Sequence, residues 1–237
     1  MTLEILYHDE HLVVINKPAG MLVHKGERLS HGREFVLQTL RDQIGQTLYP
    51  VHRLDKKTSG VLLFALSSEV ASALVKQWSE VDKQYLAVVR GHLQDTLLDL
   101  PLAPPRDKFD KNWVPGPEKP AQTRFTSLAE AELDLAIDKY PTSRYSLVLC
   151  EPLTGRKHQL RRHLRHLGHP ILCDSRYGKN RHYHYFRDHF GVDRMLLHCW
   201  KLHFIHPITR DTVKLEAPLD PIWQSIIERM GWQSALV

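Results

Sequence analysis

The sequence predicts an α+β fold, with short strands and short helices sharing one core in a single domain over residues 1–237. Strands are indicated by the apolar run Val61–Leu66, which suits a strand buried on both faces, and by the side-to-side alternation of Gln84–Arg90. A helix is indicated over Phe35–Ile44, where apolar residues recur at helical spacing. A hydrophobic content of 42% supports a substantial core, so we do not expect a disordered chain.

The remaining elements follow from the same two periodicities, taken in chain order. Ser67 or Ser68 is suited to cap a helix after the Val61–Leu66 strand, and a second helix begins near Lys157. The other expected strands are Glu4–Tyr7, Leu12–Ile15, Pro120–Phe125, Arg144–Cys150, Leu202–Ile205 and Val213–Ala217, and a terminal helix is expected at Ile222–Met230.

Two segments do not read as regular structure. Residues 101–120 hold six of the 14 prolines, so we expect a long, partly ordered loop there. The cations of this segment either keep it solvated or belong to an RNA-contacting arm in which Trp113 stacks on a base. The sequence is compatible with both alternatives. Residues 176–194 are rich in His, Tyr and Arg, and we expect a polar basic loop that is either ordinary surface or a further RNA contact.

The positive charge of the chain is concentrated in one segment. Between Arg156 and His169 there are five Lys and Arg residues and no acid, and the net charge of the whole chain is +5. The rest of the chain is therefore nearly balanced. Such clustering favours a surface that faces phosphates over a general contribution to solubility.

The cysteines and the hydropathy pattern indicate the compartment. No apolar run approaches the roughly 20 residues that span a bilayer, and the N-terminus lacks a basic region of the kind that precedes a signal sequence. Cys150, Cys173 and Cys199 are odd in number and widely spaced. We therefore expect reduced, buried thiols in a cytoplasmic protein without membrane contact.

Histidine is abundant, so a metal site has to be considered. His158, His163, His166 and His169 lie close in sequence, but His158 and His163 fall on different sides of the expected helix. The sequence has neither a His-Glu-x-x-His motif nor a Cys-x-x-Cys pair, and it has no glycine-rich phosphate loop. We expect neither a metal nor a nucleotide cofactor.

One stretch, Val51–Gly60, ends in the motif His-Arg-Leu-Asp-x-x-Thr-Ser-Gly and leads straight into the apolar strand. On pattern alone, Asp55 would cap the turn and Arg53 would pair with a surface acid. The motif, however, resembles the signature of the RluA-type pseudouridine synthases. That resemblance implies an enzyme that isomerises uridine in RNA to pseudouridine, with Asp55 as the nucleophile.

Other blocks extend the resemblance over nearly the whole chain. Asp9–His24 is similar to the opening block of the family, although its Pro-Gly turn alone would suggest a structural role, and Lys83–Gly91 resembles the block whose Tyr, here Tyr85, lies against the target base. Thr154–Arg161 is similar to the third block, whose last Arg, here Arg161, pairs with the catalytic Asp. The later blocks Gly168–Asp174 and Leu196–His198 match as well. The family further implies a mixed, largely antiparallel sheet flanked by helices, with a central active-site cleft.

The resemblance assigns roles that fit the chemistry. Asp55 would attack either C1′ of the ribose or C6 of the uracil, and Arg161, on the flank of its helix, would keep the carboxylate charged. Tyr85 would stack on the base and is placed to help move the C5 proton. Because a stacked uridine must be extruded, Arg53 is suited to fill the gap or to hold the displaced phosphate. The residues expected to contact RNA are Arg53, Lys17, Arg156, Lys157, Arg162 and Arg165.

The expected RNA is tRNA. Tyr140–Tyr145, Gly155–Leu164 and His189–Gly191 look closest to a tRNA-modifying branch of the family, which implies uridine 65 in the T-stem. The opening block begins within the first ten residues, so we expect no S4-like N-terminal RNA-binding domain, and we expect a monomer. The alternatives are a synthase of the same family acting on ribosomal RNA or several RNAs, and a non-catalytic protein that binds or folds RNA.

Overall fold

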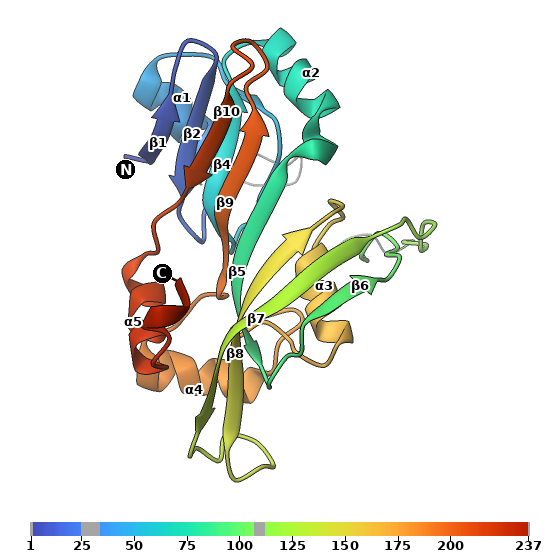
Figure 1. The fold of residues 1–237 in the computed structure, drawn as a ribbon, viewed down its shortest axis with the longest axis vertical. Coiled ribbons are helices and arrows are strands. Elements are labelled where there is room, and N and C mark those ends of the chain that lie inside the picture. Colours follow the sequence, from blue (N-terminus) through green and yellow to red (C-terminus); the bar gives the residue numbers. More distant parts are fainter. Residues whose placement is uncertain (1, 25–33, 107–111, 237) are drawn as a thin grey trace. The chain divides into compact units, whose positions relative to one another are not determined.

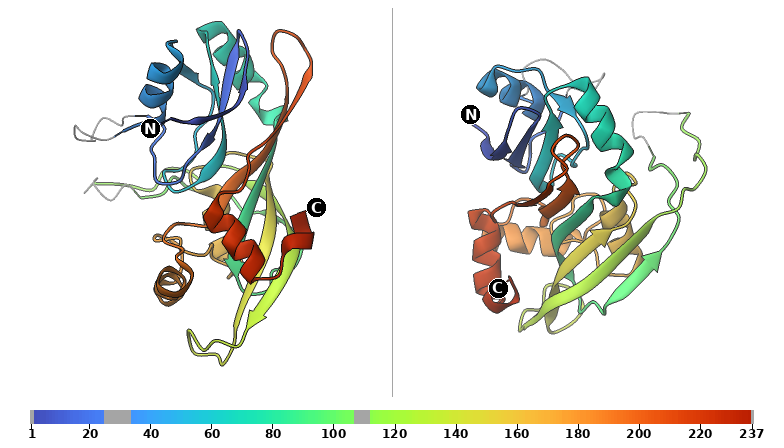
Figure 2. Two further views of the ribbon diagram at one scale, coloured as in Figure 1. Left: turned by 90° about the vertical axis from the view of Figure 1, so that its left-hand side faces the viewer. Right: turned by 45° about the horizontal axis from the view of Figure 1, so that its top comes forward.

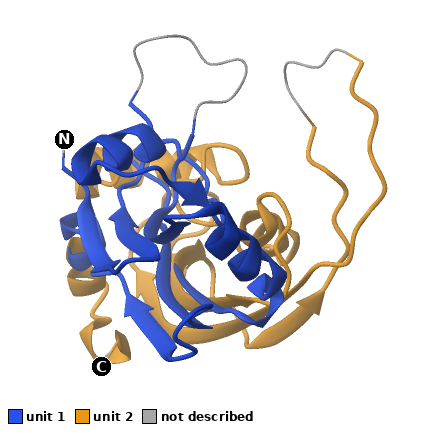
Figure 3. Ribbon diagram, turned by 90° about the horizontal axis from the view of Figure 1, so that it is seen from above, with its two compact units in different colours: residues 1–86, 194–224 blue, residues 87–193, 225–237 orange. Residues whose placement is uncertain are grey.

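The structure is a computed structural model that describes residues 2–24, 34–106 and 112–236. Its contacts divide the chain into two compact units, one made of residues 1–86 and 194–224 and the other of residues 87–193 and 225–237 (Figure 3). Both units mix strands with helices, so the predicted α+β class is confirmed. The predicted single domain stays a prediction. No helix of the described ranges is long and apolar enough to cross a membrane.

The first unit is built on a sheet with the strand order β1-β2-β4-β9-β5, while β3 pairs with β4 and β10 with β9 (Figure 1). The neighbours β1–β2, β2–β4 and β9–β10 are antiparallel, whereas β4 and β9 are parallel, as expected of a mixed sheet. Its elements are β1 (Glu4–His8), β2 (Leu12–Lys17), α1 (Val36–Ile44), β3 (Tyr49–Pro50), β4 (Ser59–Ala65), α2 (Ser68–Lys76), the short 3₁₀ helix η1 (Trp78–Glu80), the first part of β5 (Asp82–Arg90), β9 (Leu197–Ile205), β10 (Thr212–Glu216) and the start of α5 (Pro221–Arg229).

The core of this unit forms where the sequence places its apolar runs. All seven residues of β4 are buried, which confirms a strand covered on both faces. Helix α1 adds Val36 and Leu40 to this core, and α2 adds Val70 and Leu74. The capping prediction is also confirmed, because the Ser67 hydroxyl accepts a hydrogen bond from the Val70 N–H at 3.2 Å.

The second unit carries the strand order β5-β8-β7-β6, with β6–β7 and β7–β8 antiparallel. A long hairpin of β7 and β8 dominates it (Figure 1 and Figure 2). Its elements are the end of β5, β6 (Thr96–Asp99), β7 (Gln122–Leu133), β8 (Ser143–Pro152), α3 (Gln159–His166), α4 (Asn180–Phe190), the end of α5 and the 3₁₀ helix η2 (Gln233–Leu236).

The prediction of a loop over residues 176–194 is wrong, because α4 occupies Asn180–Phe190. His182 and Phe186 lie four residues apart and are the buried side of this helix. The ring of Phe186 packs edge-on against Tyr145, whose hydroxyl meets Nδ1 of His182 at 2.8 Å. A histidine thus occupies a buried position of the helix where an apolar residue is usual. For this reason the apolar residues of the segment do not show the helical period.

The proline-rich segment 101–120 connects β6 to β7, and its described parts form no strand or helix beyond a bridge between Leu102 and Lys119. This agrees with the predicted long loop. Two of its cations, Lys108 and Lys111, lie outside the described residues.

Candidate active site

Asp55 lies, as predicted, where a loop enters a buried strand. Its backbone carbonyl accepts a hydrogen bond from the Thr58 N–H at 3.0 Å, which closes a turn just before β4 begins at Ser59. Leu54 is buried beneath the turn, Asp55 is half-buried, and Arg53 is exposed. The turn therefore presents one carboxylate and one neighbouring guanidinium from a rigid strand end.

His52, the first residue of the motif, has a structural position. Its Nε2 accepts a hydrogen bond from the Leu63 N–H at 3.0 Å, and its ring stacks on Trp78 with 4.5 Å between centroids. Burial, followed by the charge of Lys83, lowers the pKa of His52 to about 3. The ring is therefore neutral at neutral pH, and it joins the Asp55 loop to the middle of β4.

Lys17 corrects one of the predicted RNA contacts. The side chain has no exposed surface, and its Nζ donates to the carbonyl oxygens of Pro18, Met21 and Lys56 at 2.7, 2.9 and 3.3 Å. Burial and the charge of Arg194 lower the pKa of Lys17 to about 7, against the opposing effect of Asp55. A buried ammonium cannot reach a phosphate on the surface. Lys17 instead holds the carbonyl next to Asp55.

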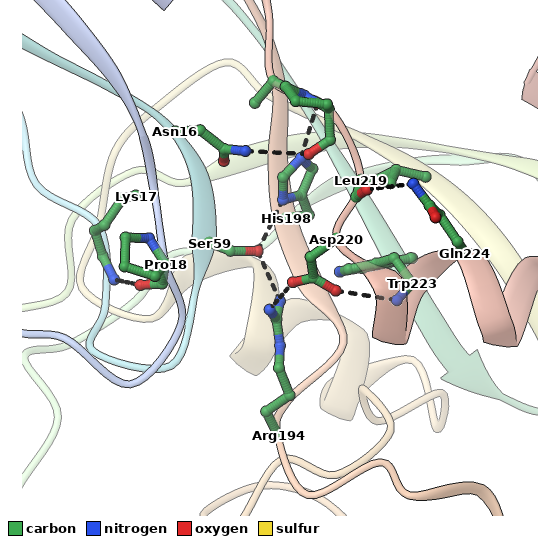
Figure 4. A network of polar contacts seen from close by, with 12 residues as sticks. Asn16, Lys17, Pro18, Ser59, Arg194, His198, Leu219, Asp220, Trp223 and Gln224 are labelled. Carbon is green, nitrogen blue, oxygen red and sulfur yellow. Dashed lines mark hydrogen bonds and ion pairs between the residues drawn. The ribbon is translucent and has the colours of Figure 1, made fainter. Parts of the chain in front are cut away.

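A polar network that the sequence did not indicate lies beside this loop (Figure 4). Arg194 donates through Nη2 to Oγ of Ser59 at 2.6 Å, and through Nη1 to the carboxylate of Asp220. Oγ of Ser59 also meets Nδ1 of His198 at 2.7 Å. The sequence offered one indication of this network. Ser59 belongs to the recognised motif and stands at the start of a buried strand, where its hydroxyl needs hydrogen-bond partners.

Tyr85 lies on β5, half-buried, and packs against the core of the first unit. It is hydrogen-bonded to the thiol of Cys199, and this bond acts against the burial that raises the pKa of Cys199 to about 12. The position of Tyr85 against a target base stays a prediction.

In the second unit, Arg161 forms a buried pair with Asp174. Its Nε and Nη2 donate to the two carboxylate oxygens at 2.7 and 2.9 Å, and the side chains are 8% and 0% exposed. Burial alone would raise the pKa of Asp174, but the hydrogen bonds and charge of Arg161 hold it below its usual value. Arg161 lies on α3, the helix predicted to carry it, and its side chain is buried there. Its pairing with Asp55, a residue of the other unit, stays a prediction.

The start of α3 is fixed by Gln159, the Gln of the third block. Its amide donates to the Gln122 carbonyl at 2.9 Å and to the Thr123 hydroxyl at 3.0 Å. Its oxygen accepts from the Thr154 hydroxyl and the Arg156 N–H, both at 2.9 Å. This buried amide ties the loop before α3 to β7 and so sets the position from which Arg161 projects.

The other predicted RNA-contacting residues differ in exposure. Lys157 is exposed, like Arg53. Arg156 and Arg162 each donate to a carbonyl of the proline-rich segment, those of Pro120 and Ala103, at 2.9 and 2.7 Å. Arg165 donates to the Tyr177 carbonyl at 3.1 Å. Each guanidinium has five N–H groups, so these bonds leave donors for phosphate.

Two of the clustered histidines form hydrogen bonds within the protein. His163 bridges the Thr123 hydroxyl and the Leu100 carbonyl at 3.0 and 3.1 Å, and His158 meets the Tyr177 hydroxyl at 3.0 Å. Within the part of the chain that the structure describes, no three or more His, Cys, Asp or Glu side chains gather as metal ligands.

The chain is similar to known proteins along nearly its whole length. The profile of the RNA pseudouridylate synthase family matches residues 11–166. The tRNA pseudouridine synthase C of Vibrio cholerae is 47% identical over 241 residues, covering 99% of this chain and 98% of that protein. The tRNA pseudouridine synthase C of Pasteurella multocida is 50% identical over 237 residues, covering 98% of each.

Solved structures show the same likeness. Human RNA pseudouridylate synthase domain containing 4 superposes with a TM-score of 0.70 at 25% identity, covering 96% of this chain and 93% of that one. Human RNA pseudouridylate synthase domain containing 1 gives a TM-score of 0.67 at 26% identity, covering 97% and 95%.

Proposed function

Since the chain belongs to the RNA pseudouridylate synthase family, we propose that it isomerises a uridine of tRNA to pseudouridine, with Asp55 as the nucleophile. One observation carries the proposal: a half-buried carboxylate sits on a turn closed by its own backbone, in a chain similar throughout to tRNA pseudouridine synthase C. A carboxylate is a weak nucleophile in water, but a fixed position against a reactive carbon makes it effective.

The reaction breaks the bond between C1′ of the ribose and N1 of the uracil, turns the base, and joins C1′ to C5. In the balance, C5 loses a proton and N1 gains one, so no oxidant or reductant is consumed. Asp55 takes part by bonding to C1′ or to C6 and is released at the end. Tyr85 stacks on the base and assists the C5 proton, while Arg161 keeps the carboxylate charged.

The target we propose is uridine 65 in the T-stem. A uridine stacked in a helix has to leave the stack before a carboxylate can reach it, at a cost of a few kcal/mol. Exposed Arg53, two residues before Asp55, is placed to occupy the gap or to bind the displaced phosphate. Lys157 and the free donors of Arg156, Arg162 and Arg165 supply phosphate contacts.

All three cysteines are buried free thiols, which suits a reducing compartment. We accordingly place the protein in the cytoplasm, where it acts as a monomer without a metal or nucleotide cofactor.

The test is a map of pseudouridine at each position of tRNA and ribosomal RNA from cells that lack the gene. We expect loss at tRNA position 65 alone, restored by the wild-type gene and not by Asp55→Asn. The purified Asp55→Asn protein should still bind tRNA, because the carboxylate adds nothing to phosphate binding. Loss of pseudouridine at ribosomal positions would show that the substrate is ribosomal RNA and not tRNA. Turnover by Asp55→Asn would show that Asp55 is not the nucleophile. An unchanged map would favour a non-catalytic RNA-binding protein.

A further inference from the structure

Arg194, Ser59, His198 and Asp220 form one polar network (Figure 4), and Ser59 directly follows the turn that begins at Asp55. We propose that Arg194 is a positioning residue for Asp55, and that it acts through Ser59 and His198 as a clamp on the strand end of this loop. The inference rests on the proposed function, because it assigns Arg194 a part in the reaction of Asp55.

The hydrogen-bond directions in the clamp are determined. Arg194 can only donate, so Ser59 accepts its N–H at 2.6 Å. The single hydroxyl proton of Ser59 is then directed to Nδ1 of His198 at 2.7 Å. His198 must in turn carry its proton on Nε2, which donates to the Ala217 carbonyl at 3.1 Å. Burial lowers the pKa of His198 to about 4, so at neutral pH the ring stays a neutral acceptor.

The clamp acts on one end of the Asp55 turn, and Lys17 acts on the other. Ser59 follows the turn that the Asp55 carbonyl closes with the Thr58 N–H. At the other end, the Lys56 carbonyl accepts from the Gly20 N–H at 2.8 Å and from Lys17 Nζ at 3.3 Å. The turn is thus bonded to other elements at Lys56 and just after Thr58, which fixes the backbone that carries Asp55.

Arg194 is itself held in place by Asp220. The carboxylate of Asp220 pairs with it and also accepts the Trp223 N–H at 3.1 Å, at the start of α5. The guanidinium therefore sits between the beginning of α5 and the beginning of β4. Loss of this one side chain would remove the hydrogen bonds that link Ser59 to Asp220 at the start of α5.

Arg194 also places a permanent charge near Lys17. The charge of Arg194 acts to lower the pKa of Lys17 and that of Asp55 acts to raise it, so both charges lie within electrostatic range of Lys17. Because Lys17 has a pKa of about 7, it loses its proton in mildly alkaline solution. Arg194 keeps its charge throughout this range. The positive charge of Arg194 near Lys17 thus remains when Lys17 itself is neutral.

The experiment compares Arg194→Met, Arg194→Lys and Ser59→Ala by single-turnover kinetics on tRNA and by tRNA binding. Arg194→Met should lower the single-turnover rate constant by about 100-fold, the usual effect of a misplaced catalytic group, with a dissociation constant near the wild-type value. Arg194→Lys should recover part of the rate, because it restores the charge but not the planar fork. Arg194→Met combined with Ser59→Ala should be no slower than Arg194→Met alone, since both cut one contact.

Arg41→Met is the matched control in the same unit. Arg41 pairs with Asp42 at 2.7 Å on the surface of α1, and its loss should leave the rate constant unchanged. A rate constant unchanged in Arg194→Met would overturn the proposal. So would equal losses of rate, tRNA binding and melting temperature without recovery in Arg194→Lys, because that pattern describes a scaffold residue.

A second measurement does not depend on turnover. Titration of the Lys17 side chain by NMR should give a higher pKa in Arg194→Met than in the wild type, because a neighbouring positive charge is removed. An unchanged Lys17 titration would contradict the electrostatic effect that we assign to Arg194. If the wild type fails to modify tRNA while Lys17 responds, the proposed function fails and the clamp remains as a loop anchor without a part in that reaction.

Discussion

The buried guanidinium of Arg161 pairs with the carboxylate of Asp174, which also accepts the Arg176 N–H at 2.9 Å and the Tyr177 N–H at 3.2 Å. A charge removed from water in this way is stable only while its partner is present. The pair therefore ties α3 to the turn that follows Asp174. It also holds the side chain that we propose to act on Asp55.

Asp174→Ala should lower the free energy of unfolding by about 3–5 kcal/mol, because it removes one partner of a buried ion pair and also the acceptor of the Arg176 and Tyr177 N–H groups. Asp188→Ala is the matched control, since Asp188 pairs with Arg187 at the same 2.7 Å but on the exposed face of α4. There we expect little or no loss, because water screens an exposed ion pair. Urea unfolding of the two variants measures the difference, and equal losses would contradict a special role for the buried pair.

At the residue scale, the sequence predicted the groups within motifs but not their buried partners. Asp55 and Arg161 stand at fixed places in recognisable blocks. The partner of Arg161 lies 13 positions away, and that of Ser59 lies 135 positions away. Such pairings exist only once the strands and helices have packed. The same limit explains Lys17, whose burial is decided by three carbonyl oxygens of the surrounding turns.

The parallel pairing of β4 with β9 depends on one backbone position, Gly60. Its φ of +106° is one that residues with a side chain rarely adopt, and a Cβ there would come within 2.1 Å of the Cys199 carbonyl oxygen. Gly60 therefore allows β9 to approach the strand that begins just after the Asp55 turn. Both strain and collision oppose any substitution.

Gly60→Ala should lower the free energy of unfolding by about 3 kcal/mol or more and should also reduce activity, since Ser59 and the clamp move with it. Gly45→Ala tests strain alone. Gly45 ends α1 with a φ of +70°, and a Cβ there would meet no atom within 4 Å. Its expected loss is about 1 kcal/mol without an effect on activity. Denaturation and single-turnover assays compare Gly60→Ala with Gly45→Ala. Equal losses of stability and of activity in the two variants would show that the close approach of β9 is unimportant.

At the element scale, apolar periodicity predicted most helices and strands, while the mixed, largely antiparallel character of the sheet came from the family resemblance. The buried run of β4 and the helical spacing of α1 are properties of contiguous residues. Helix α4 was missed because its buried face uses His182, whose burial depends on the distant hydroxyl of Tyr145. Polar residues that find partners across the fold are invisible to a local pattern.

At the scale of the whole molecule, neither compact unit is a continuous piece of chain. The backbone passes from one unit to the other between residues 86 and 87, 193 and 194, and 224 and 225. The sheet of the first unit needs β9, which the chain supplies only after most of the second unit. No local sequence pattern could reveal this interleaving. It also means that residues 1–86 lack a central strand of their own sheet.

We therefore expect the chain to unfold in a single transition, and buried histidines in both units provide the test. Burial lowers the pKa of His52, in the first unit, to about 3 and that of His182, in the second, to about 4, from 6.5. Above pH 6.5 these histidines are neutral in both the folded and the unfolded chain, so their titration does not change the free energy of unfolding. As the pH falls below 6.5, the unfolded chain takes up protons that the folded chain refuses, so stability falls, by up to about 1.4 kcal/mol per pH unit for each group.

His52→Gln and His182→Gln should each flatten this acid dependence, whereas His184→Gln, at an exposed ring of α4, should leave it unchanged. Unfolding is followed through Trp78 in the first unit and Trp232 in the second, each studied with the other tryptophans replaced. In one cooperative transition, both probes report the same midpoint, and either substitution shifts it for both. Two midpoints, with His52→Gln moving only the Trp78 signal, would show that the units unfold separately, and the interleaved chain would then impose no cooperativity.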